Sequence, residues 1–202
     1  QVGIFGAEPW TDSMRDEIQK EFNMHAVDIY GLSEVLGPGV ANECVETKDG
    51  LHIWEDHFFP EIIDPETGQI MEDGELGELV LTTLSKEALP MIRYRTRDLT
   101  RLLPGTARSM RRIEKVTGRS DDMIILRGVN IFPTQIEEIV LQTPEIATHF
   151  QIHLSNDGPL DKMKVLVETL KETNNEKLVT SIKQKVLQKV KDTIGVSIDI
   201  AV

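Results

Sequence analysis

Apolar and polar residues follow different patterns in the two parts of the chain, and the change falls near residue 119. In the first part, short apolar runs at residues 2–5 and 26–30 predict two strands. Thr11 or Asp12 can cap a helix between them. The apolar residues of that helix recur at every fourth position, at Met14, Ile18 and Phe22. A strand, a helix and a strand of this length predict a βαβ unit, in which ligands bind at the carboxyl ends of the strands.

Turn-forming residues divide the next segment into further strands. Apolar runs at residues 51–54, 61–64 and 76–83 are separated by the turn sequences at 64–68 and 72–74. This spacing predicts a β-meander. We expect it to form a structural, barrel-like subdomain.

The segment that follows is a joint between two packed units. Gly118 and Gly128 allow backbone angles that a side chain would forbid. Between them lie Arg119, the aspartates at 121 and 122, and an apolar run at 123–126. Two acids beside an arginine suit an exposed connection that exchanges ion-pair partners, rather than a core.

Beyond the joint, Pro133 and the capping-box pattern Thr134-x-x-Glu137 predict the start of a helix. The expected elements are strands at 123–126, 150–154 and 163–167, a helix at 134–142, a long helix and a last strand. The long helix should bury Leu178, Ile182, Val186 and Val190. This βαββαβ order is typical of a ferredoxin-like domain.

These patterns predict an α/β protein of two domains. Residues 1–118 would form the larger domain, with the βαβ unit at 1–50 and the β-barrel-like subdomain at 51–118. Residues 119–202 would form a small α+β, ferredoxin-like lid, joined through a hinge at 119–122.

Composition narrows the classes of partner. The chain has 202 residues, 40% of them hydrophobic, and a net charge of −12, which argues against nucleic acid or an anionic membrane. The single Cys44 excludes an intrachain disulfide and fits a reducing compartment. The sequence contains no signal peptide and no apolar run that could cross a bilayer, so we expect a cytoplasmic location. It starts without Met inside one apolar run and stops inside another, so we expect both ends to be cut.

The arginines are unevenly distributed. Eight of them fall in one window before the joint, at positions 93, 95, 97, 101, 108, 111, 112 and 119. They form either a solvated basic face or a surface that meets an anion such as phosphate.

Candidate chemistry follows the second predicted strand, at residues 30–34. Tyr30 offers a flat face for an aromatic base, and Gly31 allows close approach of a ligand. Ser33 can donate to a phosphate oxygen, and Glu34 can hold Mg²⁺ that bridges phosphates. Taken alone, the pattern does not outweigh a surface turn with a stray acid. A Gly-x-Ser-x-Gly nucleophile motif is excluded because Val35 stands where the second glycine should be.

A second candidate group consists of Cys44, His52 and His57. Cysteine and histidine at these spacings, across a turn, could hold Zn²⁺. The sequence has no Cys-x-x-Cys pair, so ordinary strand histidines are the favoured interpretation.

Four blocks, in this order along the chain, resemble the adenylate-forming acyl-CoA synthetases and ligases. Residues 6–9 resemble the adenine-binding loop of that family, and residues 30–34 its Tyr-Gly-x-Thr/Ser-Glu motif. Asp98 resembles its ribose-binding aspartate, although Arg97 replaces the commoner glycine and leaves the shape of that loop open. The fourth block begins with Gly-Arg-Ser-Asp-Asp at 118–122, which is similar to the hinge motif. It continues to Arg-Gly-Val-Asn-Ile-Phe-Pro at 127–133, which resembles the phenylacetate–coenzyme A ligase branch.

The resemblance implies a role for each matching residue. Ser33 and Glu34 would be catalytic, with Glu34 as the Mg²⁺ ligand, and Asp121 would be the pivot of the hinge. The cofactor-binding residues would be Gly6, Ala7, Glu8, Pro9, Asp28, Tyr30, Gly31, Asp98, Arg119 and Gly128. Asp98 would accept from both ribose hydroxyls, because the two oxygens of a carboxylate match a vicinal diol. Gly128 would line the pantetheine tunnel.

By the same resemblance, residues 1–118 are the carboxyl-terminal part of the large adenylate-forming domain. The implied activity is ATP-dependent ligation of coenzyme A to an aryl acid, with phenylacetate favoured, through an acyl-adenylate. The implied cofactors are ATP, Mg²⁺ and coenzyme A, and the family suggests a homodimer. Zn²⁺ stays an alternative only through the spacing of Cys44, His52 and His57.

The family's phosphate loop should precede residue 1 and its catalytic lysine should follow Val202, so we expect the chain alone to be inactive. Two other classes stay open: a non-catalytic nucleotide- or CoA-binding module, and an adenylating enzyme that loads a carrier protein. Binding of a ligand without adenylate formation would identify the first, and reaction with a carrier protein in place of free coenzyme A the second.

Overall fold

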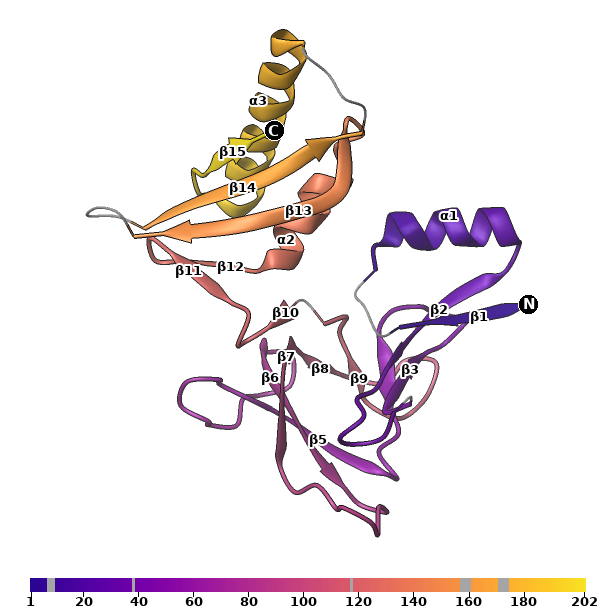
Figure 1. The fold of residues 1–202 in the computed structure, drawn as a ribbon. Helices are drawn as coiled ribbons and strands as arrows, with labels where there is room; N and C mark the ends of the chain where they lie inside the picture. The colour runs from indigo at the N-terminus through magenta and orange to yellow at the C-terminus, as the bar shows by residue number, and fades with distance from the viewer. Residues whose placement is uncertain (7–9, 38, 117, 157–160, 171–174) are drawn as a thin grey trace. The chain divides into compact units, whose positions relative to one another are not determined.

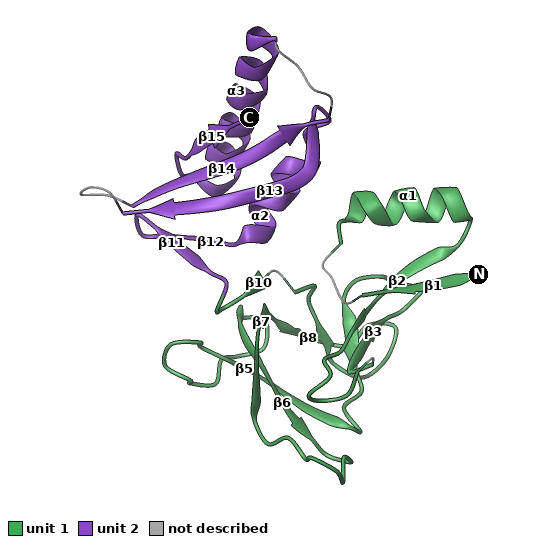
Figure 2. Ribbon diagram, in the orientation of Figure 1, with its two compact units in different colours: residues 1–121 green, residues 122–202 purple. Residues whose placement is uncertain are grey.

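The structure is a computed structural model that describes residues 1–6, 10–37, 39–116, 118–156, 161–170 and 175–202. The chain divides into two compact units, Gln1–Asp121 and Asp122–Val202 (Figure 2). The boundary between the units falls inside the range 119–122, where the sequence places a hinge. Rotation about it stays a prediction.

Unit 1 begins with the predicted βαβ arrangement (Figure 1). Strand β1 (Val2–Phe5) and strand β2 (His25–Tyr30) pair in parallel, and helix α1 (Asp12–Phe22) connects them in the sequence. Thr11 is the N-cap, and its Oγ1 accepts from the Met14 N–H at 3.2 Å. The apolar stripe of α1 is largely exposed in this chain, because Met14 is 43% and Phe22 64% accessible.

A six-stranded sheet combines strands from residues 1–50 with strands from residues 51–118. Its order is β1-β2-β3-β4-β9-β8, with β3 (Ala41–Glu43), β4 (Leu51–Ile53), β8 (Leu102–Leu103) and β9 (Arg112–Ile113). The division expected at residue 50 therefore runs through a continuous sheet.

The second sheet of unit 1 is antiparallel and has the order β10-β7-β6-β5. It consists of β5 (Phe58–Ile63), β6 (Gly77–Thr83), β7 (Tyr94–Thr100) and β10 (Gly118–Arg119). The meander prediction is wrong for residues 51–54, because β4 pairs with β3 and β9 in the other sheet. All three residues of β4 are buried, and a short buried run carries no information about which sheet it joins.

Unit 2 is a three-stranded sheet with two helices and a separate hairpin. The hairpin is formed by β11 (Ile124–Leu126) and β12 (Val129–Ile131), and the sheet by β13 (Ile146–Ser155), β14 (Lys162–Thr169) and β15 (Asp199–Ala201). Helices α2 (Pro133–Leu141) and α3 (Glu176–Ile194) contribute Ile136, Ile182, Val186 and Val190 to one core with the sheet. The mixed α/β class is thus confirmed.

Three details of unit 2 differ from the prediction. Among the described residues, the strand at 124–126 pairs with β12 and not with β13, β14 or β15, so the described sheet has one strand fewer than the ferredoxin-like order implies. Leu178 is 39% exposed, because it lies in the first turn of α3. The capping box is also shifted: with Pro133 as the first helical residue, Phe132 is the N-cap, and the Gln135 Oε1 accepts from its N–H at 3.0 Å.

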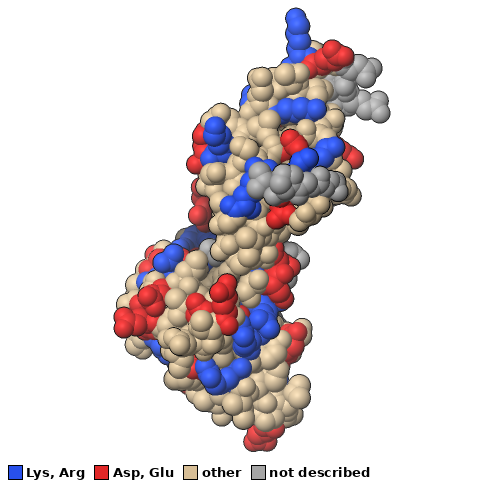
Figure 3. All heavy atoms as spheres, turned by 90° about the vertical axis from the view of Figure 1, so that its left-hand side faces the viewer, with Lys and Arg blue, Asp and Glu red and all other residues tan. Residues whose placement is uncertain are grey.

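No helix among the described residues has the length and hydropathy needed to cross a bilayer. On the face drawn in Figure 3, the described basic and acidic side chains are interspersed.

Candidate functional site

Three of the predicted residues meet in unit 1 around the carboxylate of Asp98. Tyr30 ends β2, Asp98 lies in β7, and Arg119 lies directly opposite Asp98 in β10. The Tyr30 hydroxyl donates to Asp98 Oδ2 at 2.5 Å, and Arg119 Nη1 donates to Asp98 Oδ1 at 3.3 Å. Each oxygen of this carboxylate therefore has a donor from a different strand.

Arg119 also reaches the expected pivot. Its Nε and Nη2 donate to the two carboxylate oxygens of Asp121, both at 2.9 Å, and its Nη1 donates to the Thr96 carbonyl at 3.3 Å. A bidentate arginine–carboxylate pair fixes both distance and orientation. Arg119 thus bridges the carboxylates of Asp98 and Asp121.

The charge states follow from burial and from these contacts. Burial raises the pKa of Asp98, while the hydrogen bond from Tyr30 and the charge of Arg119 favour its ionised form. The hydrogen bond from Arg119 lowers the pKa of Asp121. Burial and the neighbouring Asp98 raise the pKa of Tyr30 far above its ordinary value. Tyr30 is therefore a hydrogen-bond donor throughout the physiological range.

Thr96 supports this group and was missed in the sequence. Its hydroxyl donates to the Leu79 carbonyl at 2.9 Å and accepts from the Asp98 N–H at 3.1 Å, and the residue is 4% exposed. Between the two, Arg97 has φ of 71°, at an irregularity in the pairing of β6 and β7. The pattern Thr-x-Asp was the available signal, because a threonine hydroxyl often binds the main chain two residues on.

Ser33 and Glu34 lie in the exposed turn after β2. Lys86 holds this turn, because its Nζ donates to the carbonyl oxygens of Glu34 at 3.0 Å and Val35 at 2.8 Å. Lys86 was also missed, since a single lysine in a loop gives no local signal. The contacts of the described residues do not connect Ser33 or Glu34 with the group around Asp98.

The remaining predicted nucleotide positions have mixed outcomes. Ala7, Glu8 and Pro9 lie outside the described residues. Gly6 approaches β2 so closely that a Cβ would lie 2.5 Å from the Ile29 carbonyl oxygen. Close packing is therefore a reason for glycine at this position. Gly31 is exposed.

Asp28 is 9% exposed, and its N–H donates to Glu43 Oε2 at 2.8 Å. Burial raises the pKa of its carboxyl. A role in nucleotide binding stays a prediction for this residue.

Gly128 lies in unit 2 and has a conformational reason to be glycine. It follows Arg127 in the turn of the β11–β12 hairpin, with φ of 80° and 52° respectively. In two-residue hairpin turns of type I′, both central positions have positive φ. The expected contact with pantetheine is a separate prediction.

The residues considered for zinc are divided between two places. The Cys44 Sγ lies 3.5 Å from the His52 Nδ1, and both side chains are buried. Burial raises the pKa of the thiol and lowers that of the imidazole, so the pair is neutral. His57 is exposed and contacts Ser85 and Asp56. Within the described ranges, no three His, Cys, Asp or Glu side chains gather as metal ligands, so the zinc interpretation has no support.

The eight arginines of the basic window all have acidic partners, and a role in binding an anion stays a prediction. Each lies within 4.0 Å of a carboxylate of unit 1. The pairs are Arg93–Glu61, Arg95–Glu78, Arg97–Glu78, Arg101–Glu114, Arg108–Glu46, Arg111–Glu55, Arg112–Asp49 and Arg119–Asp98. Four of these arginines pair with acids in strands β5, β6 and β7, and the other four pair with acids in turns and loops.

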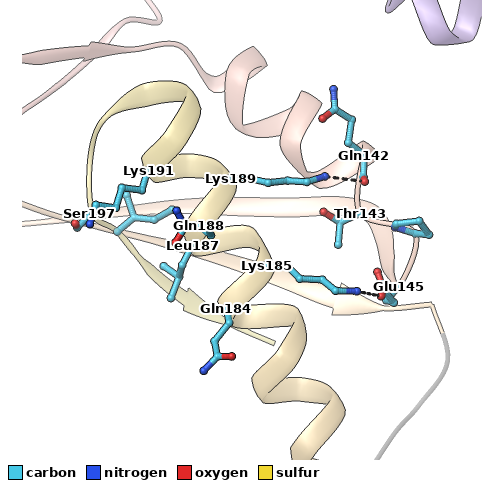
Figure 4. Close-up of a pocket in the computed structure, with 12 residues that line it drawn as sticks. Gln142, Thr143, Glu145, Gln184, Lys185, Leu187, Gln188, Lys189, Lys191 and Ser197 are labelled. Carbon is cyan, nitrogen blue, oxygen red and sulfur yellow. Dashed lines mark hydrogen bonds and ion pairs between the residues drawn. The ribbon is translucent and has the colours of Figure 1, made fainter.

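A hollow of about 1030 Å³ lies in unit 2 beside α3 (Figure 4). Lys185 forms an ion pair with Glu145, and the Lys189 Nζ donates to the Gln142 carbonyl at 2.9 Å. These contacts tie α3 to the segment between α2 and β13. None of the predicted site residues lines this hollow.

Comparison with known proteins gives consistent matches. Residues 128–202 match the family of the AMP-binding enzyme C-terminal domain. A phenylacetate-coenzyme A ligase of Pseudomonas putida is 60% identical over 98% of this chain and 45% of the relative. One of Escherichia coli (strain K12) is 53% identical over 100% of this chain and 47% of the relative. The chain spans about half the length of the curated relatives it matches.

Among solved structures, a 2-hydroxyisobutyryl-CoA ligase in the postadenylation state, in complex with R3-HIB-AMP, matches with a TM-score of 0.85. The two share 22% sequence identity, and the match covers 99% of this chain and 44% of that chain. This likeness concerns the fold alone. By sequence, the chain is similar over nearly its whole length to about half of each of these phenylacetate-coenzyme A ligases, and its residues 128–202 match the AMP-binding enzyme C-terminal domain.

Proposed function

We propose that the protein containing this chain ligates coenzyme A to an aryl acid, phenylacetate first among them, in an ATP-dependent reaction. The acid's carboxylate attacks the α-phosphate of ATP, which gives an acyl-adenylate and releases pyrophosphate. The thiol of coenzyme A then attacks the adenylate carbonyl and releases AMP. The observation that carries this proposal is the group of Tyr30, Asp98, Arg119 and Asp121.

Asp98 is the proposed acceptor for the ribose. Its two carboxylate oxygens already hold two donors from different strands, 2.5 and 3.3 Å away. The vicinal hydroxyls of a ribose present the same pair of donors, so the diol can replace one or both of them. Tyr30 supplies a ring beside this position for the adenine.

Arg119 and Glu34 are the proposed residues for the charged part of the nucleotide. An anion that attacks an anionic phosphate needs positive charge to neutralise the transition state. Arg119 supplies this positive charge. Its Nη1 can exchange Asp98 for a phosphate while the hydrogen bonds to Asp121 hold the guanidinium in place. The exposed carboxylate of Glu34 suits Mg²⁺, which binds through one or two carboxylates together with the phosphates of the substrate.

The second half-reaction needs a different surface, because coenzyme A replaces pyrophosphate. We propose that unit 2 rotates about Asp121, the last residue of unit 1, and presents Gly128 to the pantetheine arm. Two steps with different second substrates suit a lid that turns on a few residues.

The test is acid-dependent release of pyrophosphate by the full-length protein with ATP, Mg²⁺ and a panel of aryl and aliphatic acids. Asp98→Ala and Glu34→Gln should each lower the rate by at least about a hundredfold. The matched controls are Asp16→Ala and Glu17→Gln in α1, both exposed, which should retain the rate. Equal rates in all four variants would contradict the assigned roles.

Adding coenzyme A to the same assay separates a ligase from an enzyme that loads a carrier protein. Adenylate that persists with coenzyme A and disappears with a pantetheine-bearing carrier would identify the second. ATP binding without pyrophosphate release, across the whole panel, would identify a binding module. The 202-residue chain alone should be inactive, and turnover by it would contradict that expectation.

A further inference from the structure

A fully buried carboxylate lies beside the proposed hinge and has no part in the function above. Glu78 in β6 is 0% exposed. The Arg95 Nε donates to its Oε1 at 2.9 Å and the Arg95 Nη2 to its Oε2 at 2.6 Å, and Arg97 lies 3.7 Å away. Burial alone would raise the pKa of Glu78, but these arginines lower it, so the carboxylate is ionised. Arg95 already satisfies both oxygens.

Among the described residues, Glu78 has one further hydrogen-bond partner, and that partner lies within the hinge segment 119–122. The Ser120 hydroxyl donates to Glu78 Oε2 at 3.3 Å, and the Ser120 N–H donates to the Arg97 carbonyl at 2.7 Å. Ser120 comes directly between Arg119 and Asp121 in the sequence, so its position affects the main chain that carries both of these residues. A buried ion pair is weak evidence for stability, but it can fix one geometry among several.

We propose that Glu78 is a positioning residue: it anchors Ser120 and thereby holds Arg119 where its guanidinium spans Asp98 and Asp121. The inference rests on the proposed function, in which those two aspartates serve the ribose and the hinge. Without the anchor, residues 119–121 keep the main-chain bond of Ser120 but lose the side-chain bond. The main chain that carries Arg119 and Asp121 is then less well ordered, and the nucleotide meets a less ordered site.

The proposal predicts that the KM for ATP changes more than the kcat for thioester formation. Ser120→Ala removes one hydrogen bond to a charged group and leaves the Arg95–Glu78 pair intact. We expect the KM for ATP to rise roughly three- to tenfold, with kcat for thioester formation within about twofold. Ser120→Thr retains the hydroxyl and should restore the KM. Ser85→Ala is the control, because Ser85 is an exposed serine of unit 1 that bonds only His57 among the described side chains.

Amide hydrogen exchange of the 202-residue chain provides a readout that is independent of activity. Ser120→Ala should raise the exchange rate of the amides at 119–121 at least about threefold, while Ser85→Ala leaves them unchanged. Unchanged exchange in Ser120→Ala overturns the anchor, whatever the full-length protein catalyses. Faster exchange with an unchanged KM for ATP overturns the positioning role. Faster exchange in a protein that makes no adenylate with any acid supports the anchor and contradicts the proposed function instead.

Glu78→Gln extends the test to the carboxylate itself. It leaves the size of the side chain unchanged but removes the charge that Arg95 and Arg97 need. If this variant folds, it should reproduce the raised KM of Ser120→Ala, and the double variant should add little to either change. Additive effects of the two substitutions would contradict a shared route through Ser120.

Discussion

Tyr30 offers the sharpest test at the scale of single residues. Tyr30→Phe removes the donor that lies 2.5 Å from Asp98 Oδ2 and leaves the ring in place. Because the acceptor is a mostly buried carboxylate, we expect a loss of about 1.5 to 3 kcal/mol in the free energy of unfolding at pH 7. Urea denaturation of the chain measures it. Tyr94→Phe is the matched control, since among the described residues no hydrogen bond of the Tyr94 hydroxyl is found, and it should cost less than about 0.5 kcal/mol.

The same variant should show a characteristic dependence on pH. Burial raises the pKa of Asp98, and the bond from Tyr30 opposes that rise, so Tyr30→Phe should raise it further. A carboxyl with a raised pKa in the folded state stabilises the fold below its ordinary pKa, and this contribution is lost as pH rises through the folded value. The gap in stability between wild type and Tyr30→Phe should therefore widen as pH rises above the ordinary pKa of an aspartate, about 4. A gap that stays constant above this pH would show that Asp98 is not the ionised acceptor.

The sequence predicts some of these residues and hides others for a physical reason. Asp98, Arg119 and Asp121 could be named because each stands in a recognisable local pattern. Glu78 lies about 20 residues before Asp98, in a strand where three apolar residues follow it and no motif marks it. Its importance arises from the pairing of β6 with β7 and of β7 with β10, and pairing between strands leaves no mark on a local pattern.

At the scale of elements, helix α1 is fastened to the first sheet by one buried ion pair. The Arg15 Nη1 donates to Glu43 Oε2 at 2.6 Å and the Arg15 Nη2 to Glu43 Oε1 at 3.0 Å, with the side chains 10% and 5% exposed. Glu43 Oε2 also accepts from the Asp28 N–H. One carboxylate thus joins α1, β2 and β3.

Breaking this pair should be costly. Arg15→Met leaves Glu43 buried without its partner, and we expect the free energy of unfolding to fall by about 3 to 5 kcal/mol. Lys20→Met, at an exposed position in the last turn of α1, should change it by less than about 0.5 kcal/mol. Equal small changes in both variants, measured by urea denaturation, would mean that α1 is held by its other contacts.

Elements with strong periodicity or clear caps were predicted well, and short ones were not. The βαβ order and the buried positions 182, 186 and 190 of α3 follow from spacing alone and are confirmed. Strands β4, β8, β9 and β10 have two or three residues each, which is too short for a period of two to register. Their places in the two sheets, and hence the ladder that sets Arg119 opposite Asp98, depend on contacts between distant segments.

For the whole molecule, the two separate cores predict two separate unfolding events. One core centres on Ile53, Leu79 and Ile113 in unit 1, and the other on Val165, Ile182 and Val190 in unit 2. Leu79 and Ile182 are both 0% exposed, so truncating either to alanine should lower stability by about 2 to 5 kcal/mol.

Because each core is complete within its own unit, the loss should stay there. Leu79→Ala should speed amide exchange in the strands of unit 1 and leave α3 protected, and Ile182→Ala should do the reverse. Native-state hydrogen exchange of the 202-residue chain distinguishes this from a single cooperative fold, in which either substitution would lower protection throughout. Independent opening is also what the proposed reaction requires, because a lid that turns between two half-reactions must move without unfolding the part that holds the nucleotide. A single cooperative transition would therefore count against the proposed rotation about Asp121, as well as against the division of the chain into two units.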